Sequence, residues 1–192
     1  MNDEEIRAAT VGEPKVHDGP IDLVDSDPVW PDLFTRESER IRSALGNVAR
    51  ALEHVGSTSV PGLAAKPIID IVLVVSDSAN EPDYVPALEA IGYVLRVREP
   101  DWYEHRMVAR NEPNVQIHVF SEGCPEIERM LLFRNRLRSN TADRDLYERT
   151  KRQLARRTWR YVQNYADAKT AVVNDIIARS GERGSYPGDA SP

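Results

Sequence analysis

The segment 54–70 contains the residue types that bind an anion. It reads HVGSTSVPGLAAKPIID, in which Gly56 comes directly before three hydroxyl residues, Ser57, Thr58 and Ser59. Glycine adopts turns that other residues resist, and hydroxyls together with turn N–H groups bind anionic oxygens. Lys66 adds a positive charge further along the segment. We therefore expect these five residues to hold an anion, although hydroxyls in tight turns also bond their own backbone and an exposed lysine is commonly only solvated.

Asp70 lies inside the apolar run 68–75. A fully apolar run of this length predicts a strand that is buried on both faces. A carboxylate within it needs a partner charge, a metal or a substrate to offset its desolvation. Asp70 is therefore our first candidate for a catalytic residue, and pairing with an arginine or capping of a turn is the alternative.

Two histidines border apolar runs, His54 before the turn and His118 in the run 115–120. Each is either a half-buried histidine with a backbone partner or a functional group. If both converge on Asp70, they form a two-histidine, one-carboxylate set that suits zinc or another transition metal. Cys124 is the only cysteine, so a cysteine-based zinc site is excluded. A histidine acting as a general base near neutral pH is a further hypothesis.

Charge is distributed unevenly along the chain, whose net charge is −6. Residues 1–40 hold eleven acidic and four basic side chains, whereas residues 129–160 hold eleven basic and three acidic ones. We expect most of these arginines to be solvated or to pair with the acidic N-terminal part. The arginines are not interleaved with aromatic residues at regular intervals and the overall charge is acidic, so we favour a small anionic ligand over a nucleic acid as the partner.

Four side chains of this basic segment are more selective candidates for anion binding. Arg134 and Arg138 are one helical turn apart, as are Tyr147 and Lys151. Guanidinium groups bind phosphate or carboxylate oxygens in pairs. We therefore expect the four residues to face one ligand from two adjacent helices.

Hydrophobic periodicity predicts the elements that must position these residues. We expect a helix between Pro31 and Gly46, strands over 48–55 and 68–75, a helix over 83–91, strands over 93–97, 103–109 and 115–120, and helices over 127–137, 143–161 and 166–177. Charge, glycine and proline without apolar periodicity predict flexible segments at 1–20 and 181–192. The remaining parts are a core over 21–123 and C-terminal helices over 124–180 that pack on it.

No apolar stretch approaches the ~20 residues that a membrane span requires. The first residues, MNDEE, are acidic, whereas a secretory signal would be basic and then apolar. We therefore expect a cytoplasmic protein without a membrane partner.

Four words of the sequence carry a family resemblance: the segment 54–70, QIHVF at 116–120, FRNRLR at 133–138 and YERTK at 147–151. Together they resemble the GrpB family of nucleotidyltransferase-like proteins, in the polymerase-beta superfamily, over about residues 20–180. The resemblance implies an α+β fold, with a nucleotidyltransferase-like mixed β-sheet, flanking helices and a C-terminal helical extension.

The resemblance also implies an activity. The glycine–serine turn would hold the phosphates of a nucleoside triphosphate, carboxylates on neighbouring strands would hold magnesium or manganese, and a nucleoside monophosphate would pass to a small acceptor. Active members carry Asp-x-Asp or Asp-x-Glu where this chain reads Asp70-Ile-Val72, and His118 stands where the third carboxylate belongs. Three hypotheses follow: a nucleotidyltransferase, an inactive nucleotide- or anion-binding module on the same fold, and a different group transferase with a histidine base.

Overall fold

A five-stranded mixed sheet lies at the centre of residues 1–181, which are the residues that the computed structural model describes. Its strands are β1 (Ala51–Val55), β2 (Ile69–Val75), β3 (Val94–Glu99), β4 (His105–Arg110) and β5 (Val115–Ser121). The strand order is β1-β2-β5-β4-β3. The central β2–β5 pair is parallel and the other pairs are antiparallel.

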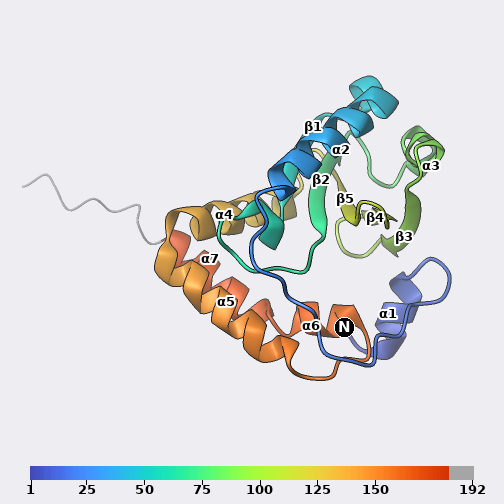
Figure 1. The fold of residues 1–192 in the computed structure, drawn as a ribbon. Helices are drawn as coiled ribbons and strands as arrows, with labels where there is room; N and C mark the ends of the chain where they lie inside the picture. Colours follow the sequence, from blue (N-terminus) through green and yellow to red (C-terminus); the bar gives the residue numbers. More distant parts are fainter. Residues whose placement is uncertain (182–192) are drawn as a thin grey trace, which may run out of the picture.

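Helices cover both faces of the sheet (Figure 1). They are α1 (Asp3–Ala9), α2 (Trp30–Leu45), α3 (Val85–Ala90), α4 (Pro125–Ser139), α5 (Thr141–Ala155), α6 (Val162–Asp167) and α7 (Thr170–Gly181), with short 3-10 turns at Gly46–Val48, Ser57–Ser59 and Glu81–Asp83. The α2 and α3 helices pack on one face and α4 on the other. The α5, α6 and α7 helices extend beyond α4 (Figure 1). The predicted α+β class, with a mixed sheet and flanking helices, is confirmed.

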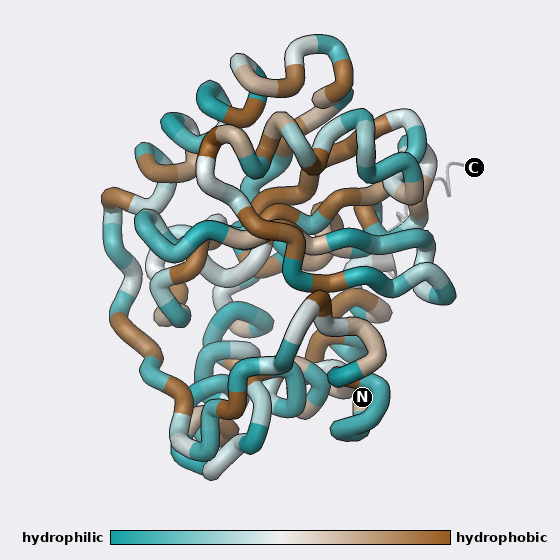
Figure 2. Tube along the Cα trace, turned by 90° about the vertical axis from the view of Figure 1, so that its right-hand side faces the viewer, coloured by the Kyte–Doolittle hydropathy of each residue, from teal (hydrophilic) through white to brown (hydrophobic). Residues whose placement is uncertain are grey.

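The apolar run of β2 explains how this strand can lie inside the sheet, between β1 and β5. Ile71 and Leu73 face the core under α2, whereas Val72 and Val74 face α4. Successive side chains of a strand point to opposite faces, so a strand covered on both sides must be apolar at nearly every position. Figure 2 shows the resulting brown, hydrophobic strands at the centre and mostly teal, hydrophilic helices around them. Asp70 is the exception within β2.

The C-terminal helices differ from the sequence prediction in two places. The predicted helix 143–161 ends at Ala155, because the following residues turn so that Trp159 pairs with Gly19. The predicted helix 166–177 is two helices, α6 and α7, with a turn at Lys169 between them. This turn places Lys169 in the candidate functional site.

The N-terminal segment also differs from the prediction, because α1 forms within the part that was expected to be flexible. Asn2 and Glu5 form a reciprocal capping box at its start. Ile6 is buried, and the Val11 N–H donates a hydrogen bond to the carbonyl of Arg96 in β3. One apolar residue in a helix of this length gives no periodicity, so the sequence did not indicate it. The predicted flexible tail lies, from residue 182 onwards, outside the described residues.

Within residues 1–181, no helix is both long enough and apolar enough to cross a membrane.

Candidate functional site

The turn at Gly56 places its backbone directly against the Asp70 carboxylate. The β1 residue before the turn, Val55, pairs with Asp70. Gly56 has φ +67°, and a Cβ atom on it would lie 2.1 Å from Asp70 Oδ2. Only glycine allows this approach. The Asp70 side chain keeps 26% of its exposure, and burial raises its pKa to about 6 although Lys66 and Lys169 oppose the rise.

Two of the three hydroxyls brace the turn. Thr58 Oγ1 donates a hydrogen bond to the Ile68 carbonyl at 2.9 Å, and it lies 3.1 Å from His54 Nε2. Ser59 Oγ donates to the Gly56 carbonyl at 2.6 Å. Both side chains therefore bond to the backbone of their own segment, which is the alternative to anion binding for hydroxyls in a tight turn.

The third hydroxyl faces a cluster of lysines. Lys151 Nζ donates a hydrogen bond to Ser57 Oγ at 3.0 Å and another to the Ala64 carbonyl, and Lys151 is only 2% exposed. Lys66 and Lys169 complete what we call the lysine cluster (Lys66, Lys151 and Lys169). Burial lowers the pKa of Lys151 to about 7 and those of Lys66 and Lys169 to about 8, and the charge of Lys169 further lowers the pKa of its two neighbours.

Two tyrosines support the lysine cluster. Lys151 Nζ lies over the Tyr147 ring at 5.0 Å, and Lys169 Nζ lies over the Tyr165 ring at 4.5 Å. Tyr147 and Lys151 were predicted from the sequence, whereas Tyr165 and Lys169 were missed. The signal was present, because both pairs have the spacing Tyr-x-x-x-Lys. It was hidden by the expectation of one continuous helix over 166–177.

The lysine cluster carries more positive charge than its surroundings neutralise. In the described part of the chain, no carboxylate oxygen forms a salt bridge with any of its three ammonium groups. Asp70 acts from a longer distance and raises the pKa values of Lys66 and Lys169, while Glu148 raises that of Lys151. Buried charge without a close partner is unfavourable, so an anionic ligand would stabilise this arrangement.

A chain of side-chain contacts leads away from Asp70 on its other side. His118 Nε2 lies 4.0 Å from Asp70 Oδ1, and His118 Nδ1 lies 3.1 Å from His105 Nε2. His105 Nδ1 in turn lies 2.6 Å from Glu99 Oε2. Burial, with a smaller effect of His105, lowers the pKa of His118 to about 3, so its ring is neutral at physiological pH. The sequence did not indicate Glu99 or His105 as site residues.

His54 does not join this group. It pairs with Ile71 in the β1–β2 register and stacks on Phe34 of α2, with ring centroids 4.7 Å apart, so it lies on the opposite face from Asp70. Burial, followed by the charges of Arg138 and Arg134, lowers its pKa to about 4. The expectation that His54, Asp70 and His118 converge is therefore corrected.

The predicted metal set is not assembled by these residues. Among the described residues, no group of three or more histidine, cysteine, aspartate or glutamate side chains is placed to hold a metal ion. Val72, beside Asp70 on the same face, is fully buried against α4. The residues present thus do not fit a divalent ion held by the protein alone.

The two predicted arginines bind the backbone of the turn. Arg138 donates two hydrogen bonds to the Ser59 carbonyl, from Nε at 2.9 Å and from Nη2 at 2.7 Å. Arg134 Nη1 donates to the His54 carbonyl at 2.9 Å and to Glu53 Oε2 at 2.8 Å. We expected both arginines to face a ligand, but they hold the turn from α4.

Other arginines of the basic segment pair with the acidic N-terminal part, as expected. Arg152 Nη2 lies 2.9 Å from Asp25 Oδ1, and Arg160 Nη1 lies 2.7 Å from Asp3 Oδ2.

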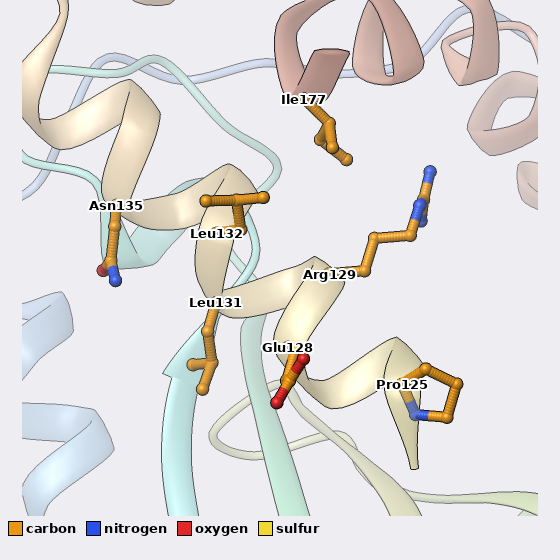
Figure 3. Close-up of a pocket in the computed structure, with 7 residues that line it drawn as sticks. All are labelled: Pro125, Glu128, Arg129, Leu131, Leu132, Asn135 and Ile177. Carbon is orange, nitrogen blue, oxygen red and sulfur yellow. The ribbon is translucent and has the colours of Figure 1, made fainter. Parts of the chain in front are cut away.

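A surface hollow of about 480 Å³ lies between α4 and α7 (Figure 3). Its lining residues are Pro125, Glu128, Arg129, Leu131, Leu132, Asn135 and Ile177. None of the candidate residues described above lines it, so we place the site at Asp70 and the lysine cluster instead.

Residues 20–179 match the family model of the GrpB protein. A UPF0157 protein of Halalkalibacterium halodurans is 59% identical over 178 residues, which cover 93% of this chain and 91% of that protein. The crystal structure of the conserved protein GrpB from Enterococcus faecalis has a TM-score of 0.70 at 29% identity, over 84% of this chain and 98% of that one.

A longer relative carries an enzyme name. A dephospho-CoA kinase of Mycolicibacterium paratuberculosis is 30% identical over 187 residues, which cover 84% of this chain but only 46% of that protein. Its name therefore describes a protein about twice as long as the matched part. From the family model and the relatives together, we conclude that this chain belongs to the GrpB family.

Proposed function

We propose that this protein binds a nucleoside triphosphate by its phosphates at the lysine cluster and transfers the nucleoside monophosphate to a small acceptor. The observation that carries the proposal is the convergence of Lys66, Lys151 and Lys169 around Ser57 and Asp70, without a close carboxylate partner among the described residues. The resemblance of the glycine–serine turn to nucleotidyltransferases supports the same assignment.

The lysine cluster suits a polyphosphate in two ways. Nucleotidyl transfer consists mostly of positioning and of neutralising the charge that develops on the phosphates. Three ammonium groups supply that charge, and Ser57 offers a hydroxyl beside Lys151. Because the pKa values of the lysines are lowered to about 7 or 8, a bound phosphate would also restore their full protonation.

We propose that the Asp70 carboxylate contacts the reacting group. It lies under the turn, beside the lysine cluster and 4.0 Å from His118. We assign no step to a metal held by the protein. A divalent ion would enter with the nucleotide and supply further charge neutralisation.

Pyrophosphate release tests this proposal. The protein is incubated with each labelled nucleoside triphosphate, Mg²⁺ or Mn²⁺, and a cell metabolite extract. Dephospho-CoA is the first pure acceptor to add, because one relative is a dephospho-CoA kinase by name.

We expect pyrophosphate release that Asp70→Asn abolishes while nucleotide binding remains. Asp101→Asn, at an exposed position, is the matched control. Failure of the wild-type protein to bind any of the triphosphates would contradict the proposal.

A second candidate function is a nucleotide-binding module without turnover. The observation that favours it is Val72, which is fully buried where the resemblance implies a second carboxylate. The same experiment separates the two candidates, because a module would bind the triphosphate at the lysine cluster and release no pyrophosphate.

A further inference from the structure

We propose that Glu99 and His105 are positioning residues that hold the proton of His118 on Nδ1, so that His118 Nε2 accepts the proton of the acceptor group. The inference rests on the proposed function for the identity of the acceptor. Its structural basis is the chain of contacts from Glu99 through His105 and His118 to Asp70.

The hydrogen bonds determine which nitrogen of each ring carries the proton. Glu99 Oε2, 2.6 Å from His105 Nδ1, is a carboxylate oxygen and accepts from Nδ1–H. We take His105 as the neutral ring. Its Nε2 then carries a lone pair, and His118 Nδ1, 3.1 Å away, donates to it. His118 Nε2 is then left as an acceptor, and this atom faces Asp70.

The register of the sheet keeps this chain in place. Glu99 of β3 pairs directly with His105 of β4, and His118 of β5 pairs with Val72 of β2, two residues beyond Asp70. The chain therefore crosses four adjacent strands on one face of the sheet.

Packing also fixes the His105 ring. It stacks on Phe120 at 4.8 Å and meets the edge of Trp102 at 5.0 Å, and His105 is only 4% exposed. A ring held in this way cannot exchange its two nitrogens by flipping without losing both hydrogen bonds. The Glu99 end and the His118 end reach solvent, with 21% and 23% exposure.

The separation of His118 and Asp70 allows one reacting atom to contact both. Nε2 and Oδ1 are 4.0 Å apart, too far for a hydrogen bond to each other, yet one oxygen atom can lie about 2.8 Å from both. In the proposed step the O–H bond of an acceptor hydroxyl breaks and its proton forms the Nε2–H bond of His118. Burial lowers the pKa of His118 to about 3, so the ring takes this proton only as the forming P–O bond makes it acidic. The oxygen forms a bond to the α-phosphorus, and pyrophosphate leaves with the electron pair of the broken P–O bond. The Glu99 carboxylate stabilises the positive charge on the two rings.

The tautomer is measured first, on the full-length protein labelled with ¹⁵N. Long-range ¹H–¹⁵N spectra distinguish Nδ1–H from Nε2–H histidines, and the chain has only four histidines. His118→Gln assigns the signal. We expect Nδ1–H for His118 in the wild-type protein. An Nε2–H signal would overturn the inference whether or not the protein releases pyrophosphate.

The second test measures the steady-state kinetics of a Glu99 variant. Unlike a carboxylate, a glutamine amide at position 99 can donate a hydrogen bond to His105 Nδ1. This would reverse the direction of that bond and of the bond between His105 and His118. We expect Glu99→Gln to lower kcat at least tenfold and to leave KM for the triphosphate unchanged. Glu104→Gln is the matched control, because Glu104 lies in the connection that follows Glu99 but contacts Arg106 at 3.4 Å. An unchanged kcat in Glu99→Gln would overturn the inference.

The two arms separate this inference from the proposed function. Absence of pyrophosphate release from the wild-type protein would overturn both the proposed transfer and the base role of His118, while the NMR arm would still decide whether Glu99 and His105 set its tautomer.

Discussion

Two positively charged regions flank the turn at Gly56, and they use their charge differently. On the α4 side, Arg134 and Arg138 donate their hydrogen bonds to the backbone carbonyls of the turn and to Glu53. On the other side is the lysine cluster, whose ammonium groups have no salt-bridge partner within residues 1–181. The turn is therefore held by one region, and the other is the region where we propose that the phosphates bind.

The chemistry of the two side chains explains this division. A guanidinium presents several N–H groups in a fixed plane and stays charged at any physiological pH, so it suits a permanent bond to a carbonyl. A lysine ammonium is a compact charge whose pKa falls on burial. It can therefore respond to the arrival of an anion.

The largest effect should come from the turn that both regions share. Gly56→Ala should destabilise the fold by about 3 kcal/mol, because it adds a Cβ atom 2.1 Å from Asp70 Oδ2 at a φ of +67°. Urea unfolding followed by circular dichroism measures this loss. Gly62→Ala is the control, because Gly62 has φ +77° but no atom near a new Cβ. Its cost should be only the strain, about 1 kcal/mol. Equal costs would show that contact with Asp70 is unimportant.

The next effect concerns the ligand side. Lys169→Met should weaken binding of a nucleoside triphosphate about tenfold, or about 1.4 kcal/mol, because it removes one of the three charges that face the phosphates. Its free energy of unfolding should change little. Isothermal titration calorimetry measures the affinity, with Lys15→Met at an exposed position as the control. An unchanged affinity would remove Lys169 from the binding site.

The arginines that hold the turn should show the opposite pattern, with a loss of stability and little change in triphosphate affinity. Arg138→Met should lower the free energy of unfolding by about 1 kcal/mol, because the Ser59 carbonyl loses two hydrogen bonds. Arg138→Lys keeps the charge but loses the paired geometry, so it should recover only part of this loss. Thermal melts of the three proteins compare these losses. A large loss of triphosphate affinity in Arg138→Met without a loss of stability would break the comparison.

The smallest effect is the dependence of binding on pH. The pKa values of Lys151, at about 7, and of Lys66 and Lys169, at about 8, mean that the free lysine cluster loses protons as pH rises. Anions bind the protonated form, so triphosphate affinity should fall several-fold as the pH rises from about 7.5 to 8, and binding should take up protons. Calorimetry in buffers of different ionisation enthalpy measures this uptake. The slope should be shallower in Lys169→Met and unchanged in Arg138→Met, since arginine does not titrate here; a pH-independent affinity would contradict the assignment.

Part of the site could be predicted because its residues are local in sequence. The glycine turn and the apolar run containing Asp70 are close in sequence, and β1 and β2 pair across the connection 56–68, which brings Val55 opposite Asp70. His54 was misplaced for a related reason. Alternation puts it on the opposite face from Val55, and the sequence alone did not show which of the two faces the site.

The positions of most strands and helices, the burial of β2 on both faces and the turn at Gly56 were determined by the sequence, because hydrophobic period and turn chemistry are local properties. The grouping of Lys151 and Lys169 around Ser57 was decided by the tertiary structure. Lys151 lies on α5 and Lys169 lies in the turn between α6 and α7, and their placement depends on how the C-terminal helices pack. The direction of the arginines was decided in the same way, because a long charged side chain takes its partner from whichever surface the fold brings within reach.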